Sequence, residues 1–196
     1  MKQHLMALGW STIMATLSMN AAADEVTDAV QEGLQAYKSG DYSQAVGSFN
    51  YAAQLVQQLK SDQLSTVVPE PLPGWTADEV QKSSAASMFG GGISISRNYS
   101  KEGGSVGINI MADSPVLQSF MMMMSNPMML GANGGRLTKV AGNKAIVEFN
   151  AAAKNGKITV VYANRFLIEV SGHGITQNDL TQYAEKIGYA ALDKLN

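Results

Sequence analysis

The clearest cluster of potentially reactive or metal-binding side chains in this chain is a run of methionines. Met111, Met121 to Met124, Met128 and Met129 place seven thioethers within 19 residues. Thioethers are soft ligands that favour Cu(I), and the chain has no cysteine to compete for such a metal. Successive helical residues point about 100° apart, so four methionines in a row cannot all face one ion. The spacing lets Met121 and Met124 converge, joined by Met128, and these three are the candidate Cu(I) ligands.

Packing is the leading interpretation of the same segment, because methionine is a flexible apolar side chain that fills irregular cores. Leu117, Phe120, Met121 and Met124 would then be buried in the core. Met122 and Met123 would lie towards the other side, where they would contact the N-terminal helices, a partner or a lipid surface. A small apolar ligand bound at Met121, Met124 and Met128 is the alternative to the metal.

Groups suited to acid–base or nucleophilic catalysis are scarce. His173 is the only histidine after residue 23, which excludes a zinc site built on several histidines. The chain has no Gly-x-Ser-x-Gly motif to present a serine to that histidine. Asp113 and Glu148 are isolated carboxylates in the linear pattern. No catalytic or cofactor-binding residue is therefore assigned, and an envelope enzyme remains a distant alternative.

The first 23 residues have the pattern of a secretory signal peptide. Lys2 supplies a positive start, residues 5–19 are mostly apolar, and Ala21 to Ala23 end in the small-x-small pattern that signal peptidase cuts. A membrane anchor would need about 20 apolar residues, more than this segment has. We expect a periplasmic protein, with release into the medium as the alternative.

The residues after the predicted cleavage site carry mild negative charge. They contain 13 Lys and Arg against 16 Asp and Glu, with no basic run. Nucleic-acid binding needs clustered positive charge, so nucleic acid is not an expected partner. No later segment reaches transmembrane length.

Residues 24–60 are predicted to form two helices joined by a tight turn. Val26, Val30, Leu34 and Tyr37 recur at helical spacing and share one face of the first helix. Gly40 suits the left-handed position just past a helix end. Asp41 can cap the second helix through its carboxylate.

The second helix and its turn resemble a tetratricopeptide repeat. The resemblance rests on Gly40-Asp41-Tyr42 followed by Ala45, Phe49 and Ala52, with Gly33 at a small position of the first helix. Ala29, Glu32 and Ala36 depart from the family, which usually has large apolar residues there. The chain shows no second copy, although such repeats need neighbours to bury their faces. The resemblance implies a helical hairpin used for contacts.

Residues 61–74 are predicted to form a proline-containing linker, because Ser61-Asp62 breaks the helical pattern and Pro69, Pro71 and Pro73 favour extended backbone. Trp75 follows at once and is expected to fasten this linker to a core. Arg97 and Arg165 are candidates for joint anion binding, although solvated strand ends are the commoner role for such residues.

Residues 75–196 are predicted to form an α+β domain with antiparallel strands, a methionine-rich helix and a C-terminal helix. Alternating residues predict hairpins over 93–110 and 157–170, turned at 101–104 and at Ala163-Asn164. Shorter strands are expected at 137–140 and 144–149. Helices are expected from Ser114 to before Pro127, and from Thr176 or Asn178 through Ala191.

The order of four short motifs resembles an uncharacterised family of secreted bacterial proteins. These motifs are Leu72-Pro73-Gly74-Trp75, Gly90 to Gly92, Asp113-Ser114-Pro115 and Asn126-Pro127. The resemblance carries no activity. We therefore expect a non-enzymatic interaction or scaffold protein that binds another envelope protein through Tyr42, Phe49, Met122 and Met123. The sequence leaves its oligomeric state open.

Overall fold

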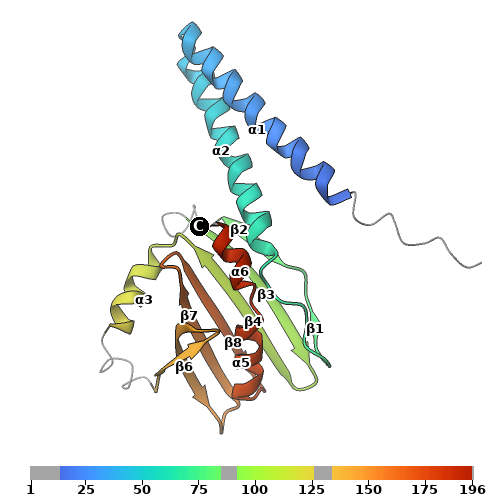
Figure 1. Cartoon of the computed structure of the whole chain (residues 1–196), viewed down its shortest axis with the longest axis vertical. Coiled ribbons are helices and arrows are strands. Elements are labelled where there is room, and N and C mark those ends of the chain that lie inside the picture. Colours follow the sequence, from blue (N-terminus) through green and yellow to red (C-terminus); the bar gives the residue numbers. More distant parts are fainter. Residues whose placement is uncertain (1–13, 85–91, 126–133, 196) are drawn as a thin grey trace, which may run out of the picture. The chain divides into compact units, whose positions relative to one another are not determined.

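The protein has an α+β fold, as the sequence predicted. The computed structural model describes residues 14–84, 92–125 and 134–195. The chain divides into two compact units between Leu59 and Lys60, a pair of helices and a sheet unit. Figure 1 shows the helices and strands of each unit.

The helical unit is a hairpin of α1 (Met14–Ser39) and α2 (Tyr42–Ser65), whose last turns lie beyond the unit boundary. Gly40 has the left-handed conformation expected of it, with φ of 83°. The Asp41 carboxylate accepts a hydrogen bond from the Gln44 amide at 3.0 Å, which confirms the predicted cap. Cleavage of residues 1–23 stays a prediction.

Small residues form the contact between the two helices. The buried positions are Ala29, Gly33 and Ala36 on α1, and Ala45, Ser48 and Ala52 on α2. They recur at alternating spacings of three and four residues, which is the pattern of a coiled-coil contact. Val30, Leu34 and Tyr37, which share a face of α1 as predicted, are exposed.

The second unit is built on one antiparallel sheet of eight strands in the order β1-β3-β4-β8-β7-β6-β5, with β2 also paired to β3. The strands are β1 (Thr76–Ala77), β2 (Gln81–Ser84), β3 (Ile93–Lys101), β4 (Gly104–Ala112), β5 (Arg136–Val140), β6 (Asn143–Asn150), β7 (Asn155–Tyr162) and β8 (Phe166–His173). Both predicted hairpins and both shorter strands are confirmed. Ala163 and Asn164 have positive φ, as a tight hairpin turn requires.

One face of this sheet carries the main core. Side chains alternate between the two faces of a strand, so Ile93, Ile95 and Tyr99 point to one side while Ser94, Ser96 and Asn98 point to the other. Helices α5 (Gln177–Glu185) and α6 (Tyr189–Leu192) lie across the core face in Figure 1. They contribute the buried side chains of Leu180, Tyr183, Ala184 and Leu192.

Residues 61–74 differ from the linker predicted for them. Helix α2 continues to Ser65, past Ser61-Asp62, and Leu64, Val67, Val68 and Leu72 are buried in the core. Pro69 is buried and accepts a hydrogen bond from Tyr99 of β3, so this segment lies against the sheet.

Aromatic side chains hold the segment in place. The Tyr99 hydroxyl donates to the Pro69 carbonyl at 2.6 Å, and the Leu72 amide donates to the Tyr183 hydroxyl at 3.4 Å. Trp75 contacts Tyr183 edge-on, with ring centroids 5.3 Å apart. The expectation that Trp75 fastens this segment to a core is confirmed.

The predicted C-terminal helix is interrupted. Thr176 and Asp179 form a capping box at the start of α5, and the chain then turns at Gly188 before α6 and a short 3-10 helix, η2 (Asp193–Leu195). A Cβ at Gly188 would lie 3.3 Å from the Val67 Cα, so the core segment and Gly188 approach closely. The Gly188 amide donates to the Val67 carbonyl at 2.9 Å. This contact, rather than continued helix, satisfies the Gly188 amide.

Trp75→Ala is expected to lower the free energy of unfolding by about 3–5 kcal/mol, because it leaves a cavity beside Tyr183. Urea unfolding followed by far-UV circular dichroism measures the change. Lys139→Ala, at an exposed strand position, is the control and should change stability by less than about 0.5 kcal/mol. Equal stability of the two variants would contradict the role given to Trp75.

Candidate functional site

The methionines lie on a short helix, α3 (Val116–Met124), which has Leu117 as its one buried residue. Met121 is 37% exposed and Met122 is 77% exposed, while Phe120, Met123 and Met124 are half-buried. The expectation that Met121 and Met124 are buried in the core is therefore wrong. The core face of the sheet is already covered by α5, α6 and residues 64–75. These segments occupy the surface on which α3 was expected to pack. Met128 lies outside the described residues.

The helical hairpin has an apolar face, made of Val30, Leu34, Tyr37, Tyr42, Val46, Phe49 and Val56. Each of these side chains is between 37% and 65% exposed. Tyr37 and Tyr42 meet across the two helices with ring centroids 5.9 Å apart. Phe49 lies over Gly33, where a Cβ would come within 2.6 Å of the ring. Both Tyr42 and Phe49, predicted as partner contacts, belong to this face.

The opposite side of the hairpin is polar. The Tyr51 hydroxyl donates a hydrogen bond to the Glu25 carboxylate, and the Gln44 amide donates to Glu32 at 3.1 Å. Glu32, Gln44 and Tyr51 each precede a buried position of the contact by one residue, whereas most residues of the apolar face follow such a position by one. The hairpin is therefore two-sided, with polar pairs along one side and uncharged apolar side chains along the other.

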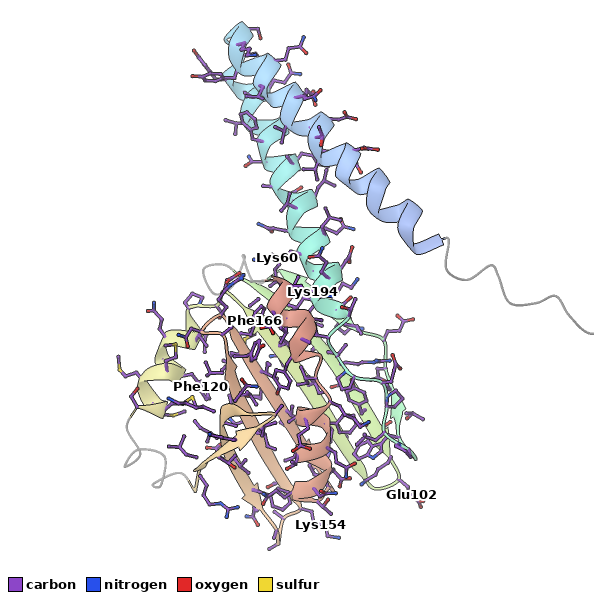
Figure 2. The ribbon with its side chains drawn as sticks, viewed as in Figure 1. Lys60, Glu102, Phe120, Lys154, Phe166 and Lys194 are labelled. Carbon is purple, nitrogen blue, oxygen red and sulfur yellow. The ribbon has the colours of Figure 1, made fainter. Side chains whose placement is uncertain are left out.

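The sheet unit carries an open groove of about 1000 Å³. Most of its lining comes from the sheet face opposite the main core, near the strand ends that join the turns of Glu102 and Lys154. Figure 2 labels both of these turn residues. Strand pairing arranges the polar lining in two rows across the sheet: Asn98, Gly107, Ser171, Lys157 and Glu148 in one, and Ser105, His173, Asn155 and Asn150 in the other.

Two sets of polar contacts lie in this groove. The Ser105 hydroxyl is within hydrogen-bond distance of the His173 ring, 3.1 Å from Nε2 and 3.3 Å from Nδ1. Lys157 pairs with Glu148 at 3.4 Å and with Glu169 at 3.8 Å. Within the described part of the chain no carboxylate pairs with His173, so Ser105 and His173 lack the third group that orients a catalytic histidine.

Asp113 and Glu148, isolated in the sequence, both have cationic partners in the fold. Arg165 binds Asp113 through two parallel hydrogen bonds, from Nε to Oδ1 at 2.9 Å and from Nη2 to Oδ2 at 3.0 Å. Lys60 adds a third contact at 2.6 Å. Hydrogen bonding from Arg165 and Lys60 outweighs desolvation and lowers the pKa of Asp113 to about 2.

Arg97 and Arg165 have separate partners, which leaves the joint anion site without support. Arg97 donates to the carbonyl oxygens of Pro69 and Asp78, at 3.1 and 3.0 Å. Arg165 also donates to the Leu195 carbonyl at 2.7 Å. Both guanidinium groups therefore fasten segments of the sheet unit together.

Sequence reasoning missed the groove as a site. Alternation within each strand indicated which side chains share a face, but the lining spans residues 98 to 173. Its central pairing joins β4 to β8, which are far apart in the sequence. No local motif encodes that pairing, so the two polar rows appear only once the register is known.

No family model, curated protein or solved structure matches this chain in the comparisons. Within residues 14–84, 92–125 and 134–195, no helix is both long and apolar enough to cross a membrane. The same residues contain no group of three or more His, Cys, Asp or Glu side chains able to hold a metal ion.

Asp113→Asn is expected to destabilise the protein near neutral pH by about 1 kcal/mol, the upper end for a pair this exposed to solvent. The folded pKa of Asp113 is about 2 and its ordinary value is 3.8. The contribution of the carboxylate is therefore complete above about pH 4 and disappears as the pH falls towards about 2. Urea unfolding at a series of pH values should show the wild-type advantage shrinking over that window. Asp78→Asn, at an exposed residue, is the matched control, and an equal effect there would contradict the assignment.

Proposed function

We propose that this chain is an exported, non-enzymatic interaction protein of the bacterial envelope, working in the periplasm. In this proposal the apolar face of the helical hairpin binds another envelope protein. The observation that carries the proposal is the exposure of seven large, uncharged side chains along one side of two packed helices. The signal-like first 23 residues support the compartment, and the resemblance to a tetratricopeptide repeat supports the role in contacts.

The chemistry of the apolar face favours a protein partner. Interface centres are depleted of charge and enriched in aromatic residues, and this face includes Tyr37, Tyr42 and Phe49. Seven side chains of this size, each about half exposed, present on the order of 600 Å² of apolar surface, which is large for a face left in water. A partner helix with its own uncharged apolar stripe is the complementary surface.

Small residues in the helix contact explain why this surface stays open. Ala29, Gly33 and Ala36 bring the two backbones close together and bury little side-chain area. Apart from Phe49, whose ring covers Gly33, the larger side chains then lie outside the contact, where a partner can bury them. Met122, 77% exposed on α3, gives the sheet unit a smaller contact surface of the same kind, with half-buried Met123 beside it.

Site-specific photo-crosslinking in living cells tests the hairpin interface. A photoreactive residue at Tyr42, on the apolar face, is expected to yield an adduct that mass spectrometry identifies as another envelope protein. The same residue at Tyr51, on the polar side of the hairpin, is the matched control and should yield none. Both positions are exposed, at 65% and 46%, so the comparison depends on chemistry rather than access.

A charge on the apolar face should abolish that adduct, because it would have to be buried in the interface. Val46→Lys introduces the charge at a 58% exposed position, and Asn50→Lys introduces it elsewhere on α2 as the control. An adduct that survives Val46→Lys, forms equally at Tyr51, or contains only a second copy of this chain would overturn the proposed partner.

Binding of Cu(I) is a second candidate function, and the exposure of the methionines favours it. Met121 and Met124 are spaced to converge on one side of α3, and Met121 is 37% exposed. Thioether sulfur is a soft donor suited to this ion. Met128 completes the proposed ligand set.

Anaerobic titration with Cu(I) in the presence of a chromophoric chelator tests this candidate. The wild type should compete for the ion, and Met121→Leu combined with Met124→Leu should weaken competition by about tenfold or more. Met111→Leu, in strand β4, is the control and should compete like the wild type. Failure of the wild type to compete would remove the copper function without affecting the hairpin proposal.

A further inference from the structure

The groove on the sheet has unused hydrogen-bonding capacity. Asn98 and Asn155 are exposed, Ser171 is half-buried, and all three line the groove. Within the described part of the chain none of their side chains has a protein hydrogen-bond partner. Each asparagine offers both donors and an acceptor, and the serine hydroxyl offers both as well.

The charged groups of the groove pair with one another and leave a net charge of −1. Lys157 is its only cation from the described residues, and Glu148 and Glu169 lie 3.4 and 3.8 Å from the Lys157 ammonium group. A free anion would compete with these two carboxylates for the ammonium group. A cation would compete with the Lys157 ammonium group for the same two carboxylates. The groove therefore favours a ligand without net charge.

The shape of the groove favours an extended ligand. Its first polar row crosses five neighbouring strands, from Asn98 on β3 to Glu148 on β6. At about 4.8 Å between strands, the row is about 19 Å long. Gly107 has no side chain at the second position of the row, and a Cβ there would lie 3.2 Å from the Asn98 amide oxygen. The Asn98 side chain thus lies over Gly107, in the space that a side chain at Gly107 would need.

We propose that this groove is a binding site for a neutral, hydroxyl-rich chain, namely an uncharged oligosaccharide. Neighbouring hydroxyl groups on a sugar each donate and accept hydrogen bonds, which matches the amide and hydroxyl groups of Asn98, Asn155 and Ser171. A peptide added as an extra strand would need a free strand edge, whereas this groove lies over paired strands in the middle of the sheet. The site belongs to the sheet unit alone and does not depend on the proposed hairpin interface.

Binding can be measured by NMR on the full chain, with uncharged glucose and N-acetylglucosamine oligosaccharides as probes. Saturable shifts confined to the groove residues are expected for at least one probe at micromolar to millimolar concentration. Ser171→Leu places bulk in the groove and should weaken that binding by about tenfold or more. Ser96→Leu is the matched control, because Ser96 lies on the same sheet face outside the groove lining, and it should bind within about twofold of the wild type.

Asn98→Ala combined with Asn155→Ala provides a second variant that removes hydrogen-bonding groups without adding bulk. It should weaken binding by about tenfold or more, and it replaces Ser171→Leu as the test if that variant does not fold. Absence of groove shifts with every neutral oligosaccharide would overturn the proposal. So would unchanged binding in the folded variants, or preferential binding of a galacturonic acid oligomer or a peptide in the groove.

Discussion

Strict alternation of side chains along antiparallel strands is the constraint on which the sheet unit depends. The strands of the central hairpins present mainly Ile, Val and Tyr to the core face, while the other face carries Ser, Asn and Lys at one end and apolar residues such as Met111 and Val161 at the other. A shift of one residue in any pairing would place Ser96 or Asn109 in the core and Ile95 in water. The apolar face then requires a cover, which α5, α6 and residues 64–75 supply. On the opposite face Ile146 and Leu167 are also buried, so part of that face is covered too. The end of that face near Glu102 and Lys154 is polar, and the groove with its hydrogen-bonding groups lies there.

The hairpin follows a different rule, because size rather than hydropathy decides what its helices bury. Close contact through Ala29, Gly33 and Ala36 excludes the larger side chains next to them. An apolar stripe on a helix usually marks the buried side. Here the stripe of Val30, Leu34 and Tyr37 lies beside a narrower contact made of small residues. Among the described residues, most of the exposed large apolar side chains consequently belong to the hairpin.

Local signals in the sequence predicted the elements of the fold well. Alternation located the strands of the two main hairpins, and Gly40 and Asp41 located the turn and cap between α1 and α2. The burial of residues 61–74 could not be predicted, because proline indicates the backbone conformation of a segment but not which residues pack against it. Contacts to Tyr99 and Tyr183, which are distant in sequence, bury that segment.

The candidate sites differ in the same way: a site made of residues near one another in the sequence could be predicted, and a site made of distant residues could not. The hairpin that exposes Tyr42 and Phe49 could be predicted because two consecutive helices have few possible arrangements, while their role as partner contacts stays a prediction. Burial of Met121 was predicted wrongly, because apolar composition cannot reveal that other segments already cover the core face. The polar rows could not be predicted at all, since the pairing of β4 with β8 decides them.

That pairing is set by the core face, so the residues of the groove are positioned by side chains on the opposite side of the same strands. Ile108 and Val170, buried and directly opposite in register, thereby fix where Gly107 and Ser171 lie. Polar substitutions in the groove can therefore change ligand binding while the packing that determines its geometry stays intact.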